Sequence, residues 1–305
     1  NDIAVVQILN QEYDAAMSNL KKICTIEPDN EVALGNIEYI NSNNLLQNQS
    51  KVIFENIDTP SDEISKIKLE YERLQSNWNT FGKNDPMWAI LTDPAKKDNK
   101  WQPGEFFETG INDIERVISY TKQLNLNLNY NKAIDFGCGI GRLTQALAMK
   151  FNEAIGVDIA PSMINTANYH NRFKQRCKYV LNNKYDLSFI PSSAIDFIYT
   201  IITLQHMKPK FSKGFIQEFM RILKRGGVLI FQIPSRRKNQ SFVNEPKMDD
   251  VQSFDASNPV MEMHGVFKDE VIKLLTDHGG KIIHIEDDKS LGEDWESFKY
   301  CVQKL

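Results

Sequence analysis

Three glycines at alternate positions follow a short apolar run near the middle of this chain. Residues 132–136 contain an acidic side chain, Asp135, and Gly137, Gly139 and Gly141 come directly after them. Glycine lets the backbone turn tightly and lets a ligand approach main-chain atoms that a Cβ would shield. Beyond Gly141 the apolar spacing becomes helical, and a helix start offers free N–H groups. A strand, a glycine-rich turn and a helix form half of a nucleotide-binding unit, so this stretch predicts a nucleotide site.

A second carboxylate has the spacing that such a site needs. Asp158 ends the apolar run 154–158 and lies 21 residues after Gly137. An acidic side chain at the end of a second strand can accept hydrogen bonds from both ribose hydroxyls. A dinucleotide fingerprint would need a further glycine where Arg142 stands, and no Tyr-x-x-x-Lys arrangement stands out. A nicotinamide-dependent dehydrogenase is therefore the weaker alternative.

Together these residues resemble the class I S-adenosylmethionine-dependent methyltransferases. Residues 135–141 match the first motif of that family, and Asp158 matches its ribose-binding acid. Residues 156–164 and 220–227 are close to the usual family sequence around strands two and five. The resemblance covers roughly residues 104–305. It implies an α/β fold with a doubly wound, Rossmann-like, seven-stranded sheet in the order 3-2-1-4-5-7-6, strand seven being antiparallel.

The resemblance also implies S-adenosylmethionine as the cofactor. It places the methionine part of the cofactor over the glycine turn and the ribose on Asp158. The adenine then lies beside the second strand, and an asparagine after the third strand hydrogen-bonds to the adenine amine. The cofactor residues that it implies are Asp135, Gly137, Cys138, Gly139, Gly141, Arg142, Asp158, Ile159, Met163, Asn182 or Asn183, and Thr200.

His206, after the fourth predicted strand, is the candidate catalytic residue. A neutral imidazole can take the proton of an alcohol or amine, although His206 could instead only line the pocket. For the acceptor we expect contacts from Arg236 and Arg237, from His264, and from Trp88 and Trp101. The arginine pair favours an acceptor that bears an anionic group. No paired metal-ligand spacing recurs, so no metal is expected.

The remaining elements must bring these residues to one edge of a sheet. Short apolar runs that alternate with helical spacings predict strands at 132–136, 154–158, 178–182, 195–200, 228–232, 281–286 and 297–302. Helices are predicted at 61–78, 110–124, 142–150, 211–223 and 268–278. Because ligands bind beyond the carboxyl ends of the strands in such folds, the candidate residues should converge there.

Three segments follow from this pattern. Residues 104–305 form the methyltransferase-like domain, and 46–103 form a helical linker. Residues 1–45 look tetratricopeptide-like, with Tyr13, Ala16, Leu20 and Pro28 at matching spacings, or form an ordinary helical hairpin. Residues 79–110 are polar, contain several prolines and include isolated large aromatic side chains. We expect them to make few buried contacts and to act as a mobile lid over the cofactor, the alternative being a fixed connector.

Composition and charge limit the classes of molecule that this protein is expected to bind. A net charge of −4 over 305 residues gives no reason to expect nucleic acid, and no apolar run approaches the roughly 20 residues of a membrane span. Four cysteines without C-x-x-C spacing fit a reducing, cytoplasmic compartment, and the absence of an initial methionine suggests residues upstream of Asn1. The expected acceptor is the O or N of a small molecule or glycan. The alternatives are a protein methyltransferase, or a non-catalytic adaptor that binds the cofactor and docks a partner through its N-terminal helices.

Overall fold

The computed structural model describes residues 20–25, 34, 37, 61–238 and 259–305. The chain divides into two compact units, Asn1–Leu69 and Glu70–Leu305. In the first unit, residues 20–25 are helical and the side chain of Leu20 is buried. Most of the residues on which the tetratricopeptide-like pattern rests, such as Tyr13 and Pro28, lie outside the described residues.

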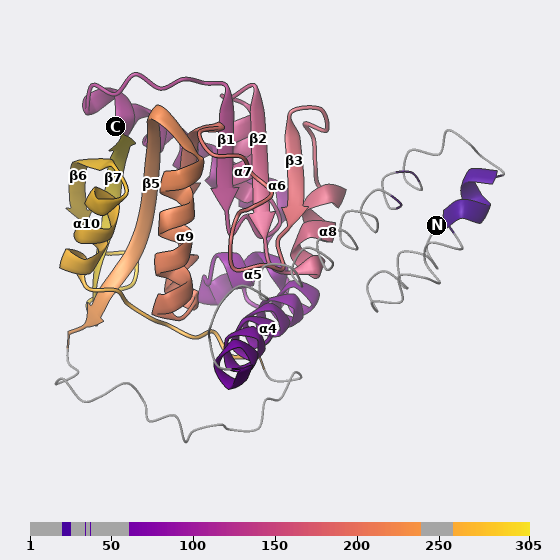
Figure 1. The fold of residues 1–305 in the computed structure, drawn as a ribbon. Helices are drawn as coiled ribbons and strands as arrows, with labels where there is room; N and C mark the ends of the chain where they lie inside the picture. Colours follow the sequence, from indigo (N-terminus) through magenta and orange to yellow (C-terminus); the bar gives the residue numbers. More distant parts are fainter. Residues whose placement is uncertain (1–19, 26–33, 35–36, 38–60, 239–258) are drawn as a thin grey trace. The chain divides into compact units, whose positions relative to one another are not determined.

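The second unit is built on one seven-stranded sheet with the order β3-β2-β1-β4-β5-β7-β6 (Figure 1). Its strands are β1 Lys132–Phe136, β2 Glu153–Asp158, β3 Cys177–Leu181, β4 Ile195–Thr200, β5 Leu223–Arg237, β6 Gly280–Asp287 and β7 Trp295–Lys304. Strands β1 to β5 pair in parallel, and β7 runs antiparallel to both β5 and β6. This confirms the predicted fold class and strand order.

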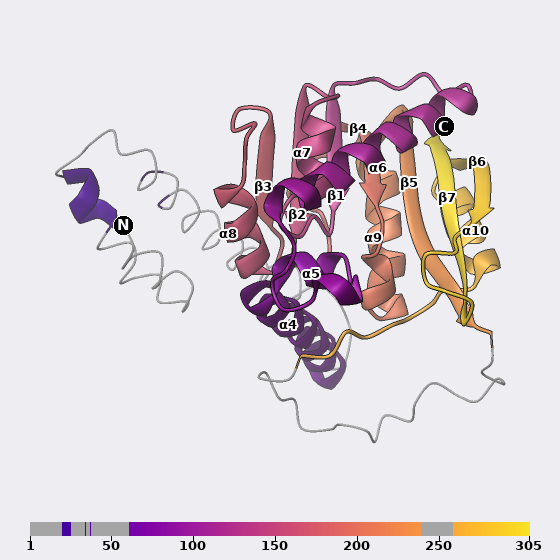
Figure 2. The ribbon, with the colours of Figure 1, turned by 180° about the vertical axis from the view of Figure 1, so that it is seen from behind.

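Helices lie on both faces of the sheet and at the edge where the parallel strands end. They are α4 Ser61–Asn84, α5 Pro86–Ile90, α6 Pro103–Gln123, α7 Arg142–Ala148, α8 Pro161–Tyr169, α9 Pro209–Ile222 and α10 Lys268–Asp277, with single 3-10 turns at Pro94–Lys96 and Leu204–His206. Figures 1 and 2 show α9 and α10 on one face and α6 and α7 on the other. Proline opens α5, α6, α8 and α9, where its missing N–H costs nothing.

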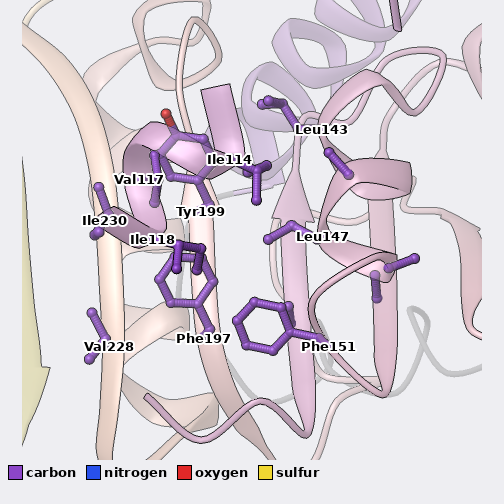
Figure 3. Close-up of a cluster of buried hydrophobic side chains, with 14 of the residues drawn as sticks. Ile114, Val117, Ile118, Leu143, Leu147, Phe151, Phe197, Tyr199, Val228 and Ile230 are labelled. Carbon is purple, nitrogen blue, oxygen red and sulfur yellow. The ribbon is translucent and has the colours of Figure 1, made fainter. Parts of the chain in front are cut away.

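Buried apolar side chains fill the space between α6, α7 and the sheet. Figure 3 shows Ile118 of α6 at the Phe197 ring of β4 and Ile114 beside Tyr199, with Leu147 of α7 and the Phe151 ring next to them. Phe151 and Phe197 stack with ring centroids 5.3 Å apart. This buried apolar layer packs α6 and α7 against the strands whose ends carry the candidate site.

Several elements differ from the sequence-based expectation. Helix α4 continues to Asn84 instead of ending at 78, and α5 was not predicted. Helix α6 starts at Pro103, seven residues before the predicted start at 110, so Phe106 and Phe107 belong to a helix and are buried. Together with the buried Ala89 of α5, they show that the expectation of few buried contacts is wrong at the two ends of 79–110, whereas most residues of 92–105 are exposed. Strand β5 is longer than 228–232 because its last residues continue to pair with β7.

None of the helices in the described ranges combines the length and the apolar character that crossing a bilayer requires.

Candidate functional site

The carboxyl ends of the parallel strands open into one cavity, at the edge of the sheet where Figure 1 draws α5 and the end of α4. The empty space in it, open solvent included, is about 870 Å³. Its wall is formed by Tyr71, Leu74, Trp78, Ala89, Ile90, Phe136, Gly137, Cys138, Gly139, Arg142, Leu143, Val157, Asp158, Ile159, Met163, Asn182, Ile201, Ile202, Thr203, His206, Met207 and Phe215. Most of the predicted cofactor residues therefore meet at one place.

The glycine turn after β1 forms part of the cavity wall. Gly137 and Gly139 have φ values of 74° and 51°, in the left-handed region that favours glycine. A Cβ at Gly137 would overlap Thr203, and one at Gly139 would overlap Ile90 of α5. The N–H groups of Gly137 and Cys138 both donate to a single backbone oxygen of β2. Glycine is thus required at both positions because Thr203 and Ile90 occupy the space of a side chain, and the Gly137 and Cys138 amides already have an acceptor.

Asp158 is bound to the same turn. Its Oδ2 accepts the Gly139 N–H at 2.8 Å, and its Oδ1 accepts the Ala160 N–H at 2.9 Å. Burial raises the pKa of Asp158, and these amide hydrogen bonds oppose that rise. Each carboxylate oxygen has a second lone pair, so the group can also accept hydrogen bonds from a ligand in the cavity. Asp158 therefore both shapes the turn and faces the cavity.

Asp135 and Gly141 support the turn from behind rather than lining the cavity. Asp135 is buried and accepts the Thr144 hydroxyl at 2.6 Å. Burial raises the pKa of Asp135 to about 6, because the charged form loses more from desolvation than the Thr144 bond restores. A Cβ at Gly141 would overlap the Tyr179 hydroxyl, so the third glycine lets β3 pack under the turn.

Arg142 follows the turn and does line the cavity. Its Nη1 donates to Asp113 at 2.5 Å and to Thr109 at 3.2 Å, which ties α7 to α6. Its Nε is buried and has no protein partner in the described structure. The buried guanidinium is therefore neutralised by Asp113 while one donor remains unused.

Of the two asparagines after β3, Asn182 lines the cavity and Asn183 does not. The Asn182 amide is buried and bonded locally, since Nδ2 donates to Asp186 O at 2.9 Å and Oδ1 accepts the Lys184 N–H at 3.1 Å. Thr200, at the end of β4, is fully buried and lies behind the wall.

His206 lies in the cavity wall with both ring nitrogens bonded. Nδ1 is 2.8 Å from Glu262 O, which can only accept, so Nδ1 carries the proton. Nε2 then accepts from the Gln205 side-chain amide at 3.1 Å. Burial lowers the pKa of His206 to about 4, and neighbouring His264 adds to this, against the bond to Glu262. The ring is therefore neutral near pH 7, with its one lone pair on Nε2.

Sequence reasoning missed the part of the wall that comes from α4. Tyr71, Leu74 and Trp78 recur at spacings of three and four, so they lie on one face of the helix, and this face lines the cavity. The Trp78 ring lies 5.0 Å from the His206 ring. The 71-74-78 spacing was visible in the sequence, but it only indicated an apolar face and not what that face covers.

A second face of α4 holds the helix against α8. The Gln75 side chain donates to Ile159 O at 3.0 Å. Asn79 accepts the Ser162 N–H at 3.0 Å on its side chain and the Ser162 hydroxyl at 2.8 Å on its carbonyl. These bonds join α4 to the loop that follows Asp158, which is the loop expected beside the adenine.

The five predicted acceptor contacts lie outside the cavity wall. Arg236 pairs with Glu296 at 2.8 Å, and Arg237 is exposed at the end of β5. His264 bonds to the Glu262 carboxylate at 2.8 Å, next to the segment that holds His206. The indole N–H groups of Trp88 and Trp101 donate to the carbonyls of Asp93 and Leu91, at 3.0 and 3.2 Å. Across the described part of the chain, no group of His, Cys, Asp and Glu side chains could hold a metal ion.

Comparisons with known proteins agree with this geometry. The profile of a family described as "Methyltransferase domain" matches residues 134–231. A ubiquinone biosynthesis O-methyltransferase of Methylococcus capsulatus is 33% identical over 72 residues, which are 24% of this chain and 30% of the relative. A ribosomal protein L11 methyltransferase of Yersinia pseudotuberculosis is 35% identical over 83 residues, which are 27% of this chain and 28% of the relative. These matches span under a third of each relative's length.

A solved structure shows the same fold over a longer stretch. The magnesium protoporphyrin IX methyltransferase of Synechocystis PCC 6803, solved with bound SAH, has a TM-score of 0.51 and 14% identity, covering 77% of this chain and 100% of that one. At this identity the likeness concerns the fold alone. The matched profile, the strand order and the meeting of the glycine turn with Asp158 together show that the chain carries a class I S-adenosylmethionine-dependent methyltransferase domain.

Proposed function

We propose that this protein is an active methyltransferase that moves the methyl group of S-adenosylmethionine to an O or N atom of a small acceptor. One observation carries the proposal: the glycine turn, Asp158 and a neutral His206 all line the same cavity. The turn suits the methionine part of the cofactor and Asp158 its ribose, and His206 is a lone-pair acceptor after β4. The residues present therefore fit both the cofactor and a proton-bearing acceptor.

Individual roles follow from the geometry. Asp158 would accept the ribose hydroxyls, and Ile159 and Met163 would flank the adenine beside Asn182. When bound, the cofactor supplies a methyl group already activated by its sulfonium. The protein's own task is then to hold the acceptor in line and to exclude water. His206 Nε2 carries the lone pair that could take the acceptor proton. The hydrogen bond from the Gln205 side-chain amide to Nε2 must break first.

Calorimetry with S-adenosylmethionine and S-adenosylhomocysteine is the direct test. We expect both to bind the folded protein, with the chain's Asp158 required for affinity. A folded sample that binds neither at hundreds of micromolar would contradict the proposal. Fluorescence enhancement of NADH on mixing would instead revive the dehydrogenase alternative.

A protein acceptor is the second candidate, and the observation in its favour is the match to ribosomal protein L11 methyltransferases. A third is an adaptor that holds the cofactor without turnover and docks a partner through residues 1–45. Incubation with S-adenosylmethionine labelled in its methyl group, in cell extract, separates these outcomes. Label in small molecules supports the first proposal, label in protein the second, and label that stays on the bound cofactor the third.

A further inference from the structure

Ile202 has a backbone conformation that isoleucine rarely adopts. Its φ is 56°, in the left-handed region, where a β-branched side chain collides with its own backbone. The other non-glycine residues with positive φ in the described chain are Asp98, Asn99, Asn125 and Ser193, all short and polar. Strain of this kind persists only where the surroundings enforce it, and it concentrates at binding sites.

A chain of hydrogen bonds from the sheet enforces the conformation of Ile202. The Ile202 N–H donates to Gln232 Oε1 at 3.2 Å. The Gln232 amide in turn donates to the Ser297 hydroxyl at 2.8 Å, and that hydroxyl donates to Asp288 at 3.0 Å. Gln232 and Ser297 are both buried, in β5 and β7. The Ile202 side chain, which lines the cavity, is thus presented by a polar network inside the sheet.

The strand order separates this part of the cavity from the nucleoside part. Asn182, Asp158 and the glycine turn follow β3, β2 and β1, whereas Ile202 and His206 follow β4. The wall residues that follow β4 are mostly apolar (Ile201, Ile202 and Met207, with Thr203 and His206), and the Trp78 ring of α4 lies beside His206. Trp78 and Ile202 are only half-buried, so they offer apolar surface to a ligand.

The charged side chains of the cavity wall, within the described chain, are Asp158 and Arg142. Both follow β2 and β1, and both are already bonded, Arg142 to Asp113 and Asp158 to two backbone amides. An anionic acceptor on the β4 side would lose its hydration without gaining a cationic side chain from this wall. A sugar would leave most of its hydroxyls unpaired against it.

We propose that the β4 side of the cavity, bounded by Trp78, Ile202 and His206, is a subsite for a neutral aromatic acceptor bearing a hydroxyl group, and that Ile202 sets its specificity. This inference rests on the proposed methyltransferase function. In the reaction, the acceptor oxygen forms a bond to the methyl carbon as the sulfur–methyl bond breaks. The electron pair stays on sulfur, which yields S-adenosylhomocysteine, and the hydroxyl proton passes to His206 Nε2 or to water.

Two probes of the same shape test the chemical class. Calorimetry on the protein saturated with S-adenosylhomocysteine would compare 2-naphthol with 6-hydroxy-2-naphthoate, which differs by one carboxylate. We expect 2-naphthol to bind at least about tenfold more tightly. Equal affinities, a preference for the carboxylate, or no binding of either probe to the saturated protein would overturn the subsite. Failure to bind S-adenosylhomocysteine at all would instead contradict the proposed function.

Three variants test the role of Ile202. I202A and I202G both remove the side chain, and we expect each to weaken 2-naphthol binding about tenfold while S-adenosylhomocysteine affinity changes less than about twofold. Glycine alone also relieves the strained φ, so I202G should melt about 2–4 °C above I202A. S193G is the matched control: it relieves a positive φ at an exposed residue outside the cavity wall, and should leave probe binding unchanged.

Each contrary result has a distinct meaning for Ile202. An equal loss of S-adenosylhomocysteine affinity in I202A would assign the side chain to the cofactor and overturn its acceptor role. Equal melting temperatures of I202A and I202G would overturn the claim that a strained backbone presents the side chain.

Discussion

At the scale of single residues, Asp158 holds the glycine turn and faces the cavity at the same time. Asp158→Asn should weaken S-adenosylhomocysteine binding by about 1–3 kcal/mol, because a neutral amide replaces a charged acceptor of ribose hydroxyls. It should also lower stability, since the amide NH₂ would face a backbone N–H of Gly139 or Ala160. Calorimetry measures the affinity and thermal melting measures the stability.

Asp196→Asn is the matched control for Asp158. Asp196 is also a buried carboxylate, but it lies at the start of β4, where it accepts the Lys132 N–H at 3.0 Å and the Lys224 ammonium at 2.9 Å. This variant should lose stability and keep its ligand affinity. If both variants lose affinity to the same degree, the ribose does not bind at Asp158.

His206 should remain neutral at pH values where an ordinary histidine is already protonated. Its folded-state pKa of about 4 lies below the unfolded value of about 6.5, so the unfolded chain binds the proton first. The stability contributed by the neutral ring is complete above pH 6.5 and is lost as the pH falls toward 4. An NMR titration of the ring carbons should show no His206 transition between pH 5 and 8. A midpoint near 6.5 would mean that the ring is hydrated rather than buried against Trp78.

At the scale of elements, the contact between α4 and α8 decides the shape of the cavity. Gly82 of α4 is buried, and a Cβ there would overlap the Ser162 hydroxyl and press on Met163, which lines the cavity. Gly82→Ala should therefore weaken S-adenosylhomocysteine binding and cancel the roughly 1 kcal/mol that alanine normally adds to a helix. Calorimetry and denaturant unfolding check both effects.

Gly214 in α9 provides the matched substitution for Gly82. A Cβ there meets nothing within 4 Å, so Gly214→Ala should raise the free energy of unfolding by about 0.5–1 kcal/mol without changing affinity. A Gly82→Ala protein that gains the same stability and binds equally well would show that α4 does not press on α8 in solution.

How far the sequence predicts these elements depends on whether their evidence is local. Strands β1 and β4 match their predicted bounds because each is a short buried run next to a clear turn. The partner of α4 could not be predicted, because Leu74 and Trp78 show an apolar face whatever lies opposite. The strained Ile202 was equally hidden, since its conformation is imposed by Gln232, which is 30 residues away in sequence. Sequence pattern finds the elements, whereas tertiary contacts decide which side chains reach the cavity.

At the scale of the whole molecule, the strand order was predicted through the resemblance and is confirmed, whereas the acceptor contacts had no such support. Arg236 and Arg237 were placed near the cavity because they follow β5, but β5 continues to pair with β7, and Arg236 is paired with Glu296. Ion pairs of this kind depend on residues remote in sequence. The acceptor side of the site is therefore the part that sequence reasoning described least well.

The last prediction concerns residues 79–110 as a cover for the cavity. Phe106 and Phe107 are buried in α6, so this end should be protected from hydrogen exchange with or without ligand. Apart from Ala89, residues 85–101 are half-buried or exposed, and they include Ile90, whose side chain lies against Gly139. If this stretch is a lid, its protection should rise clearly on adding S-adenosylhomocysteine, while β1 and β4 stay unchanged as internal references. Equal protection of 85–101 in both states would mean that it is a fixed connector, and that ligands enter past another part of the wall.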